Sequence, residues 1–269
     1  MHKLSTAERL LRRDRAVLVA LFVVLFLLSC LYTVFGVGMN MTALEMTAMS
    51  GMRDMPGAAV PGQWSIGYAV LVFLMWWVMM VAMMLPSVSP TVLLYSAMMR
   101  HSSNEQQLPE VAGAFLLGYL AIWAVFSLFA TVIQWWLETI GVVSPTMMTL
   151  IDTIPGALVL IAAGVFQFTP LKDACLSHCR SPAEFLTRRR RDGSTGAFIM
   201  GLEHGTYCLG CCWFLMALLF VGGIMNLYWI VGLAAFVALE KLTPFGAALS
   251  KLAGGALILW GIAILANIA

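Results

Sequence analysis

Residues 201–220, GLEHGTYCLGCCWFLMALLF, decide how this chain folds, because they form an apolar run long enough for a helix that crosses a membrane. At about 100° per residue, His204, Cys208 and Cys211 fall on one stripe of that helix. Met200 lies one turn below them. Ionisable residues within a span are costly and normally face the bundle interior, where they serve a function. The stripe therefore predicts a metal or redox site built from soft ligands.

Helix packing is the alternative explanation for these residues. Cysteine is a common filler between helices, and a single intramembrane histidine is often only hydrogen-bonded to a neighbour. Four such residues within nine positions, three of them on one face, favour a metal or redox site. Cys212 points about 80° away from His204, toward Gly201 and Gly205, whose G-x-x-x-G spacing lets another helix approach closely. We therefore assign Cys212 to packing.

The composition predicts an all-α fold, a polytopic transmembrane helix bundle. The chain is 61% hydrophobic and 10% charged, with a mean hydropathy of +0.92, so too little polar surface exists to cover a soluble globule. A net charge of +2 argues against nucleic acid, and the lipid surface explains the basic run at residues 188–191. No nucleotide-binding loop and no hydrolase or zinc-protease motif occurs, so neither an ATP-driven pump nor hydrolytic activity is expected.

The apolar segments predict about seven spans, with the N-terminus inside and the C-terminus outside. The spans are residues 16–37, 66–85, 111–134, 155–168, 201–220, 224–239 and 251–268. This layout places every Lys and Arg except Arg53 on the inner side, as the positive-inside bias requires. Pro86 and Pro90 are expected to break the helix after the second span.

The same segments divide the chain into three parts. They are the basic N-terminus with the first span (1–38), a Met-rich external loop (39–65) and a six-helix metal-binding core (66–269).

Methionine is the residue type in excess, with 19 in the chain. The external loop carries Met46, Met49, Met52 and Met55 at three-residue intervals. Neutral thioethers suit Cu(I) and work on an oxidising face, so the loop is predicted to capture metal; a flexible loop with a membrane-hugging apolar face is the alternative. In the second span, one stripe is formed by Met75, Met79 and Met83. It is either a conduit that passes a soft ion between thioethers or ordinary methionine packing that fills gaps in the bundle.

A second group of soft ligands lies in residues 169–182, TPLKDACLSHCRSP, at the predicted inner edge. Cys175 and Cys179 are one helical turn apart and could share a metal or form a dithiol, with His178 beside them; a chance pair of cysteines is the alternative. At 1.5 Å per residue, His204 lies about 13 Å into its span, deeper than this group. Two sites along one path are therefore favoured over one shared centre.

Three motifs give the chain a family resemblance: MWWVMMVAMMLPS at residues 75–87, TPLKDACLSHCRSP, and GLEHGTYCLGCCW followed by GGIMNLYW. Over about residues 66–269 the chain resembles the bacterial predicted metal-binding integral membrane proteins, a domain-of-unknown-function family without an assigned activity. The resemblance implies metal binding and does not extend to the Met-rich loop. Its implied ligands are Cys175, Cys179, Cys208 and Cys211, together with His178 and His204.

These patterns together predict a membrane protein that binds and translocates or delivers a soft metal, with copper(I) preferred over zinc or another soft ion. The alternatives are a membrane thiol-disulfide oxidoreductase and an assembly or accessory subunit of a membrane metalloenzyme. Expected partners are the lipid bilayer, the metal ion and a copper chaperone or metalloenzyme. The sequence leaves open whether the chain forms a homo-oligomer. An enzymatic activity is not expected.

Overall fold

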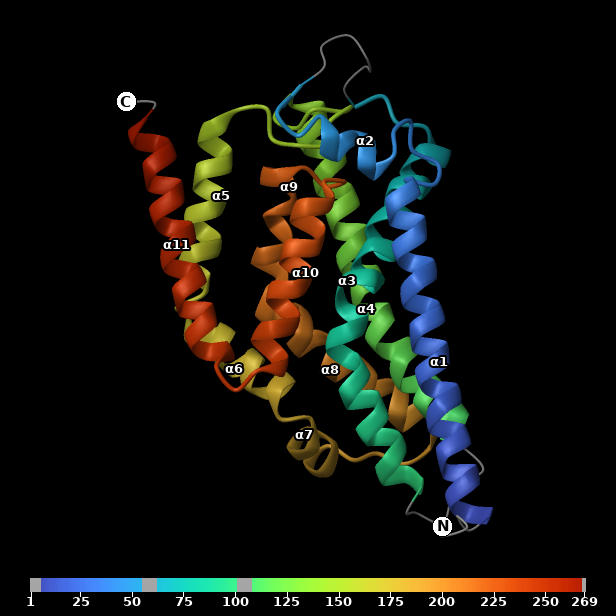
Figure 1. Ribbon diagram of the computed structural model, residues 1–269. Coiled ribbons are helices and arrows are strands. Elements are labelled where there is room, and N and C mark those ends of the chain that lie inside the picture. The colour runs from blue at the N-terminus through green and yellow to red at the C-terminus, as the bar shows by residue number, and fades with distance from the viewer. Residues whose placement is uncertain (1–5, 55–61, 101–107, 268–269) are drawn as a thin grey trace.

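The computed structural model describes residues 6–54, 62–100 and 108–267, and this part of the chain is helical with no named strand (Figure 1). The predicted all-α class is thereby confirmed. The helices are α1 (Thr6–Phe35), α2 (Ala43–Ala48), α3 (Ile66–Arg100), α4 (Leu108–Thr139), α5 (Thr153–Phe166), α6 (Pro170–Arg180), α7 (Pro182–Arg188), α8 (Gly193–Ala217), α9 (Leu219–Gly222), α10 (Leu227–Leu242) and α11 (Gly246–Ala266).

Five helical segments are long and apolar enough to cross a membrane, namely α1, α3, α4, α8 with α9, and α11. Helices α5 and α6 would add a sixth span as a pair bent by 65° at the break between them. Helix α10 has 16 residues, so its length of about 24 Å is less than the roughly 30 Å of a hydrocarbon core. The predicted count of seven spans is not confirmed and stays a prediction.

Helices α3 and α8 lie at the centre of the bundle, whereas α1 and α11 lie at its edge (Figure 1). In their most apolar windows, 56% of α3 and 50% of the α8 segment is buried, against 17% of α1 and of α11. The apolar side chains that α1 and α11 leave exposed suit contact with lipid. The start of α1 and the end of α11 lie at opposite ends of the bundle (Figure 1).

Helix α3 runs without interruption through Pro86 and Pro90, so the predicted helix break there is wrong. Proline at position 90 has no N–H to offer the carbonyl group of Pro86, which lies four residues before it. The hydroxyl of Ser89 donates to that carbonyl oxygen at 3.1 Å and replaces the missing bond. One local side chain therefore lets the helix continue where the proline rule predicts a stop.

Glycines let α4 and α8 pack backbone to backbone. A Cβ atom placed on Gly201 would collide with the carbonyl oxygen of Phe115, and one on Gly118 would collide with that of Phe198. Gly205 also lies close to α4, where its Cβ would meet the Ile122 side chain at 3.0 Å. The predicted close helix approach through Gly201 and Gly205 is confirmed, and it fixes the face that α8 turns away from α4.

Helix α2 lies at one end of the bundle and α7 at the other, and we call these the α2 end and the α7 end (Figure 1). The described part of the Met-rich segment is folded at the α2 end. Thr42 caps α2 by accepting from the backbone N–H of Glu45, whose carboxylate accepts from the N–H of Thr42 at 2.8 Å. Thr47 then accepts from the N–H of Leu227, which ties α2 to the start of α10.

Candidate metal centre

Helix α8 presents a row of buried sulfur and imidazole groups to the bundle interior. Met200, His204, Cys208 and Cys211 are all buried, as the predicted stripe requires. Cys212 is buried as well. The thiols of Cys211 and Cys212 both donate to the carbonyl oxygen of Cys208, at 3.1 and 3.0 Å. These bonds satisfy the thiol protons within the helix, so the sulfur atoms gather around one turn of α8.

The thiol of Cys179 on α6 packs against the buried cluster that contains Cys208 and Cys211. Cys212 belongs to the same buried cluster. The preference for two separate sites, derived from counting depth along straight helices, stays a prediction, but the structure places Cys179 closer to the α8 cysteines than that count implies. The reason is the 65° bend between α5 and α6, which turns α6 against α8.

Two side chains that the sequence did not single out contact Cys208. The ammonium group of Lys241, near the end of α10, donates to the sulfur of Cys208 at 2.9 Å. The phenol group of Tyr119 on α4 lies 2.9 Å from the same sulfur on a hydrogen bond in which either atom is the donor. Both residues are buried, with 6% of Lys241 and none of Tyr119 exposed. A buried ammonium group beside a thiol stabilises the thiolate form, which is the form that binds metal.

A second buried lysine explains why Lys241 is available to the thiols. Glu240, its neighbour in sequence, forms an ion pair of 2.7 Å with Lys172 of α6, and neither side chain is exposed. The hydroxyl of Ser250 donates a hydrogen bond to the amide oxygen of Gln167 at 2.8 Å, and both residues are also buried. Because Glu240 is neutralised by Lys172, the charge of Lys241 is not cancelled by the adjacent carboxylate.

His204 packs among aromatic rings. Its imidazole lies 5.9 Å from the rings of Phe115 and Tyr119 and 5.3 Å from that of Phe185, centroid to centroid. Its Nδ1 atom is buried and has no hydrogen-bond partner among the described residues. We call Cys179, Cys208, Cys211 and Cys212 the thiol cluster, and no described hydrogen bond joins His204 to it.

Cys175 and His178 lie on α6 beside Cys179 but differ in surroundings. The sulfur of Cys175 faces α8 so closely that a Cβ atom on Gly210 would lie 2.7 Å from it. His178 is exposed, stacks on Tyr207 with ring centroids 4.1 Å apart, and has its Nδ1 atom 2.8 Å from the carbonyl oxygen of Ala174. The structure thus brings Cys175 to the same helix interface as the cluster, and leaves His178 at the surface.

The predicted methionines separate into two groups. Met75, Met79 and Met83 are buried in α3 and share one hydrophobic core with the cysteines of α8. At the α2 end, Met46 is buried, Met49 is half-buried and Met52 is 47% exposed, whereas Met55 lies outside the described residues.

All six cysteines are free thiols. Within the described residues, no group of three or more His, Cys, Asp and Glu side chains is arranged as a ready metal site. The cluster therefore offers close pairs of sulfur atoms and not a preformed multi-ligand cage.

A family model described as "PpoB2: Copper chaperone" matches residues 73–264, which is more than half of the chain. The chain belongs to the PpoB2 copper chaperone family. Membership confirms the predicted link to a metal, and to copper in particular, and the matched region contains α4 to α10, which carry the thiol cluster. No curated protein and no solved structure matches the chain.

Proposed function

We propose that this PpoB2 family member is a membrane-embedded copper(I) chaperone that holds the ion between two thiolates drawn from Cys179, Cys208 and Cys211, with the third sulfur beside them as a thiol. The observation that carries the proposal is the packing of Cys179, from α6, against the core that holds Cys208 and Cys211 of α8. Thiolates are the soft ligands that select Cu(I), and copper is the metal in the family description. Cu(I) accepts as few as two sulfur ligands, so close pairs of thiols are sufficient.

The charge of Lys241 makes the site suited to a monovalent ion. Two thiolates and one Cu(I) carry a single excess negative charge, and the ammonium group 2.9 Å from Cys208 brings the sum to zero. A divalent ion with the same ligands would leave an excess positive charge in a buried setting, where unpaired charge is costly. The neutral sum therefore favours Cu(I) over Zn²⁺.

Other predicted residues take supporting places in this proposal. Cys175 and His204 flank the ligands, and Met75, Met79 and Met83 provide polarisable surroundings in the shared core. Cys212 supports the turn through its bond to the Cys208 carbonyl group. The chaperone would pass the ion to a copper-requiring protein, and a homo-oligomer is compatible with this role.

For the membrane arrangement we propose seven spans, with the N-terminus in the cytoplasm and the C-terminus outside. Its support is the distribution of Lys and Arg, all but Arg53 on one side, and the position of the start of α1 and the end of α11 at opposite ends of the bundle (Figure 1). Helix α10 is the short seventh span, and local thinning of the bilayer accommodates a span of this length. The inner membrane of a bacterium is the proposed location.

Copper content of purified full-length variants tests the ligand assignment. Protein loaded anaerobically with excess Cu(I) and then desalted should retain about one tightly bound ion per chain. Cys179→Ser, Cys208→Ser and Cys211→Ser should each lose most of it, because a neutral hydroxyl group is a poor Cu(I) ligand.

Two other serine variants are the controls. Cys30→Ser changes a thiol of α1, which packs against α2 and α3, and Cys212→Ser keeps a hydroxyl group able to donate to the Cys208 carbonyl oxygen. Both should keep their copper. Full copper retention by Cys179→Ser would refute a site shared between α6 and α8.

A further inference from the structure

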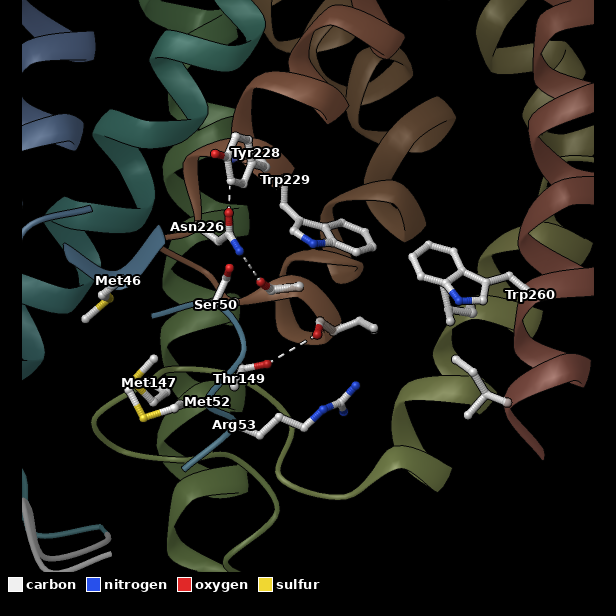
Figure 2. Close-up of a pocket in the computed structure, with 15 residues that line it drawn as sticks. Met46, Ser50, Met52, Arg53, Met147, Thr149, Asn226, Tyr228, Trp229 and Trp260 are labelled. Atoms are coloured by element: carbon white, nitrogen blue, oxygen red, sulfur yellow. Dashed lines mark hydrogen bonds between the residues drawn. The ribbon is translucent and has the colours of Figure 1, made fainter. Parts of the chain in front are cut away.

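A cavity of about 320 Å³ lies at the α2 end and is lined by three methionines from segments far apart in sequence (Figure 2). Met46 comes from α2, Met52 from the segment after it, and Met147 from the loop between α4 and α5. Met147 belongs to no pattern that the sequence singled out. Within the run of methionines at three-residue intervals, Met46 and Met52 line the cavity and Met49 does not.

The three methionines are graded in exposure. Met46 and Met147 are 5% and 4% exposed, whereas Met52 is 47% exposed. Figure 2 shows all three on the same side of the cavity. One thioether thus lies at the mouth, where an ion arrives from solution, and two lie deeper, where they are shielded from water.

Hydrogen bonds hold the Met147 loop against the Met52 segment. The backbone N–H of Met147 donates to the hydroxyl of Ser144 at 3.2 Å, and this hydroxyl donates to the carboxylate of Asp54 at 2.7 Å. Met148 adopts φ of +49°, a left-handed conformation that costs a non-glycine residue about 1 kcal/mol or more. Its carbonyl oxygen accepts from the N–H of Ile224 at 3.1 Å, which fixes this turn and thereby Met147.

The charges around the cavity are compatible with a soft cation. Its described lining contains no His, Cys, Asp or Glu, so thioethers are the sulfur ligands it offers. Among the described lining residues Arg53 is the one cationic side chain, and it extends away from the methionines toward the side where Trp260 lies (Figure 2). Neutral thioethers bind Cu(I) and Ag(I) but hold hard or borderline divalent ions poorly.

We propose that Met46, Met52 and Met147 form a second, weaker Cu(I) site at which the ion is exchanged with the surroundings. Its role as the supply for the thiol cluster rests on the function proposed above. The two sites are distinct in space, because Asn226 at the cavity precedes α10 and Lys241 lies near its other end, about 20 Å away at 1.5 Å per residue. Thioethers exchange Cu(I) more readily than thiolates do, so the ion would be bound loosely here and tightly at the cluster.

The test is titration of the full-length protein in detergent with Ag(I), a monovalent ion that binds the same soft ligands and is not oxidised. Methionines labelled with ¹³C at the ε-methyl group report thioether binding directly by NMR. After the thiol cluster is filled, further Ag(I) should shift the methyl signals of Met46, Met52 and Met147 together. The signal of Met49 should stay unchanged.

Bulk-conserving variants give the affinity of the same event. Met147→Leu and Met46→Leu should each weaken the second Ag(I) equivalent by about tenfold or more, since ligand losses exceed the 10- to 100-fold effects of outer-shell changes. Met49→Leu is the matched control from the same run and should bind both equivalents normally. The first, tight equivalent should be unchanged in all three variants.

The outcomes separate the two proposals. If the methyl signals of Met46 and Met147 do not move after the cluster is filled, or if Met49→Leu weakens the second equivalent as much as Met147→Leu, the methionine site is refuted and the thiol site stands. If wild-type protein lacks the tight first equivalent but shows the methionine shifts, the thiol-based function is refuted and the methionine site stands.

Discussion

Replacing Lys241 by methionine removes the only cationic group that contacts a thiol in the described part of the chain, and it does so with little change in volume. Met fills the space of the lysine stem, so packing against α8 is preserved. The ammonium group that donates to Cys208 at 2.9 Å is lost. We expect the bis-thiolate complex to keep its excess negative charge without compensation.

The size of the effect follows from this distance. Two unit charges 2.9 Å apart attract by about 6 kcal/mol at an effective dielectric constant of ~20. The cost of removing the ammonium group from water offsets part of this attraction. The net contribution is about 3–4 kcal/mol, in the range seen when one member of a buried pair is deleted. Because each 1.4 kcal/mol is a factor of ten, the Kd for Cu(I) should rise about 100- to 1,000-fold.

Competition with a chromophoric Cu(I) chelator, under anaerobic conditions in detergent, measures this Kd. Lys251→Met is the control, because Lys251 is an exposed lysine on α11 with no thiol contact. Zn²⁺ affinity, measured on the same samples, should fall less than Cu(I) affinity or rise, since the ammonium group disfavours a divalent ion. A Cu(I) Kd within threefold of wild type would refute the charge-balance reasoning.

Three further predictions concern the scaffold. Gly201→Ala should lower the free energy of unfolding by about 2 kcal/mol or more, because the added Cβ atom collides with the α4 backbone. Gly232→Ala, whose Cβ atom would have nothing within 4 Å, should raise it by about 0.5–1 kcal/mol. Chemical unfolding in detergent compares the two variants. Lys172→Met should lower the free energy of unfolding by about 3–5 kcal/mol, because it leaves Glu240 buried and unpaired. Adding Glu240→Leu should restore most of this loss. A double variant as unstable as the single one would contradict the ion-pair account. Reporter fusions should place the N-terminus in the cytoplasm and the C-terminus outside, and both ends on one side would exclude an odd number of spans.

Local pattern was sufficient to predict the α8 interior. The 100° stripe placed His204, Cys208 and Cys211 in the core, and the glycine spacing identified the α4 contact, because both depend only on helix geometry. The helix break at Pro86 and Pro90 failed for a local reason too. Ser89 supplies the donor that the proline lacks, and a proline rule applied alone does not count side-chain donors.

The composition of the thiol cluster could not be predicted, because it depends on tertiary contacts. Depth counted along a straight span placed Cys179 away from Cys208, and only the bend between α5 and α6 brings them together. Lys241 resembled an ordinary charge at the end of a span, as lysines often are at membrane interfaces. The adjacent pair Glu240 and Lys241 was the available signal. Glu240 forms its ion pair with Lys172, whereas the ammonium group of Lys241 donates to Cys208.

The measurement that tests the central claim most directly is copper K-edge X-ray absorption of the wild-type protein carrying one equivalent of tightly bound copper. The account predicts an edge of monovalent copper and a first shell of two or three sulfur atoms with no nitrogen or oxygen. A divalent edge, or a first shell that contains imidazole nitrogen or carboxylate oxygen, would contradict a Cu(I) site formed by Cys179, Cys208 and Cys211.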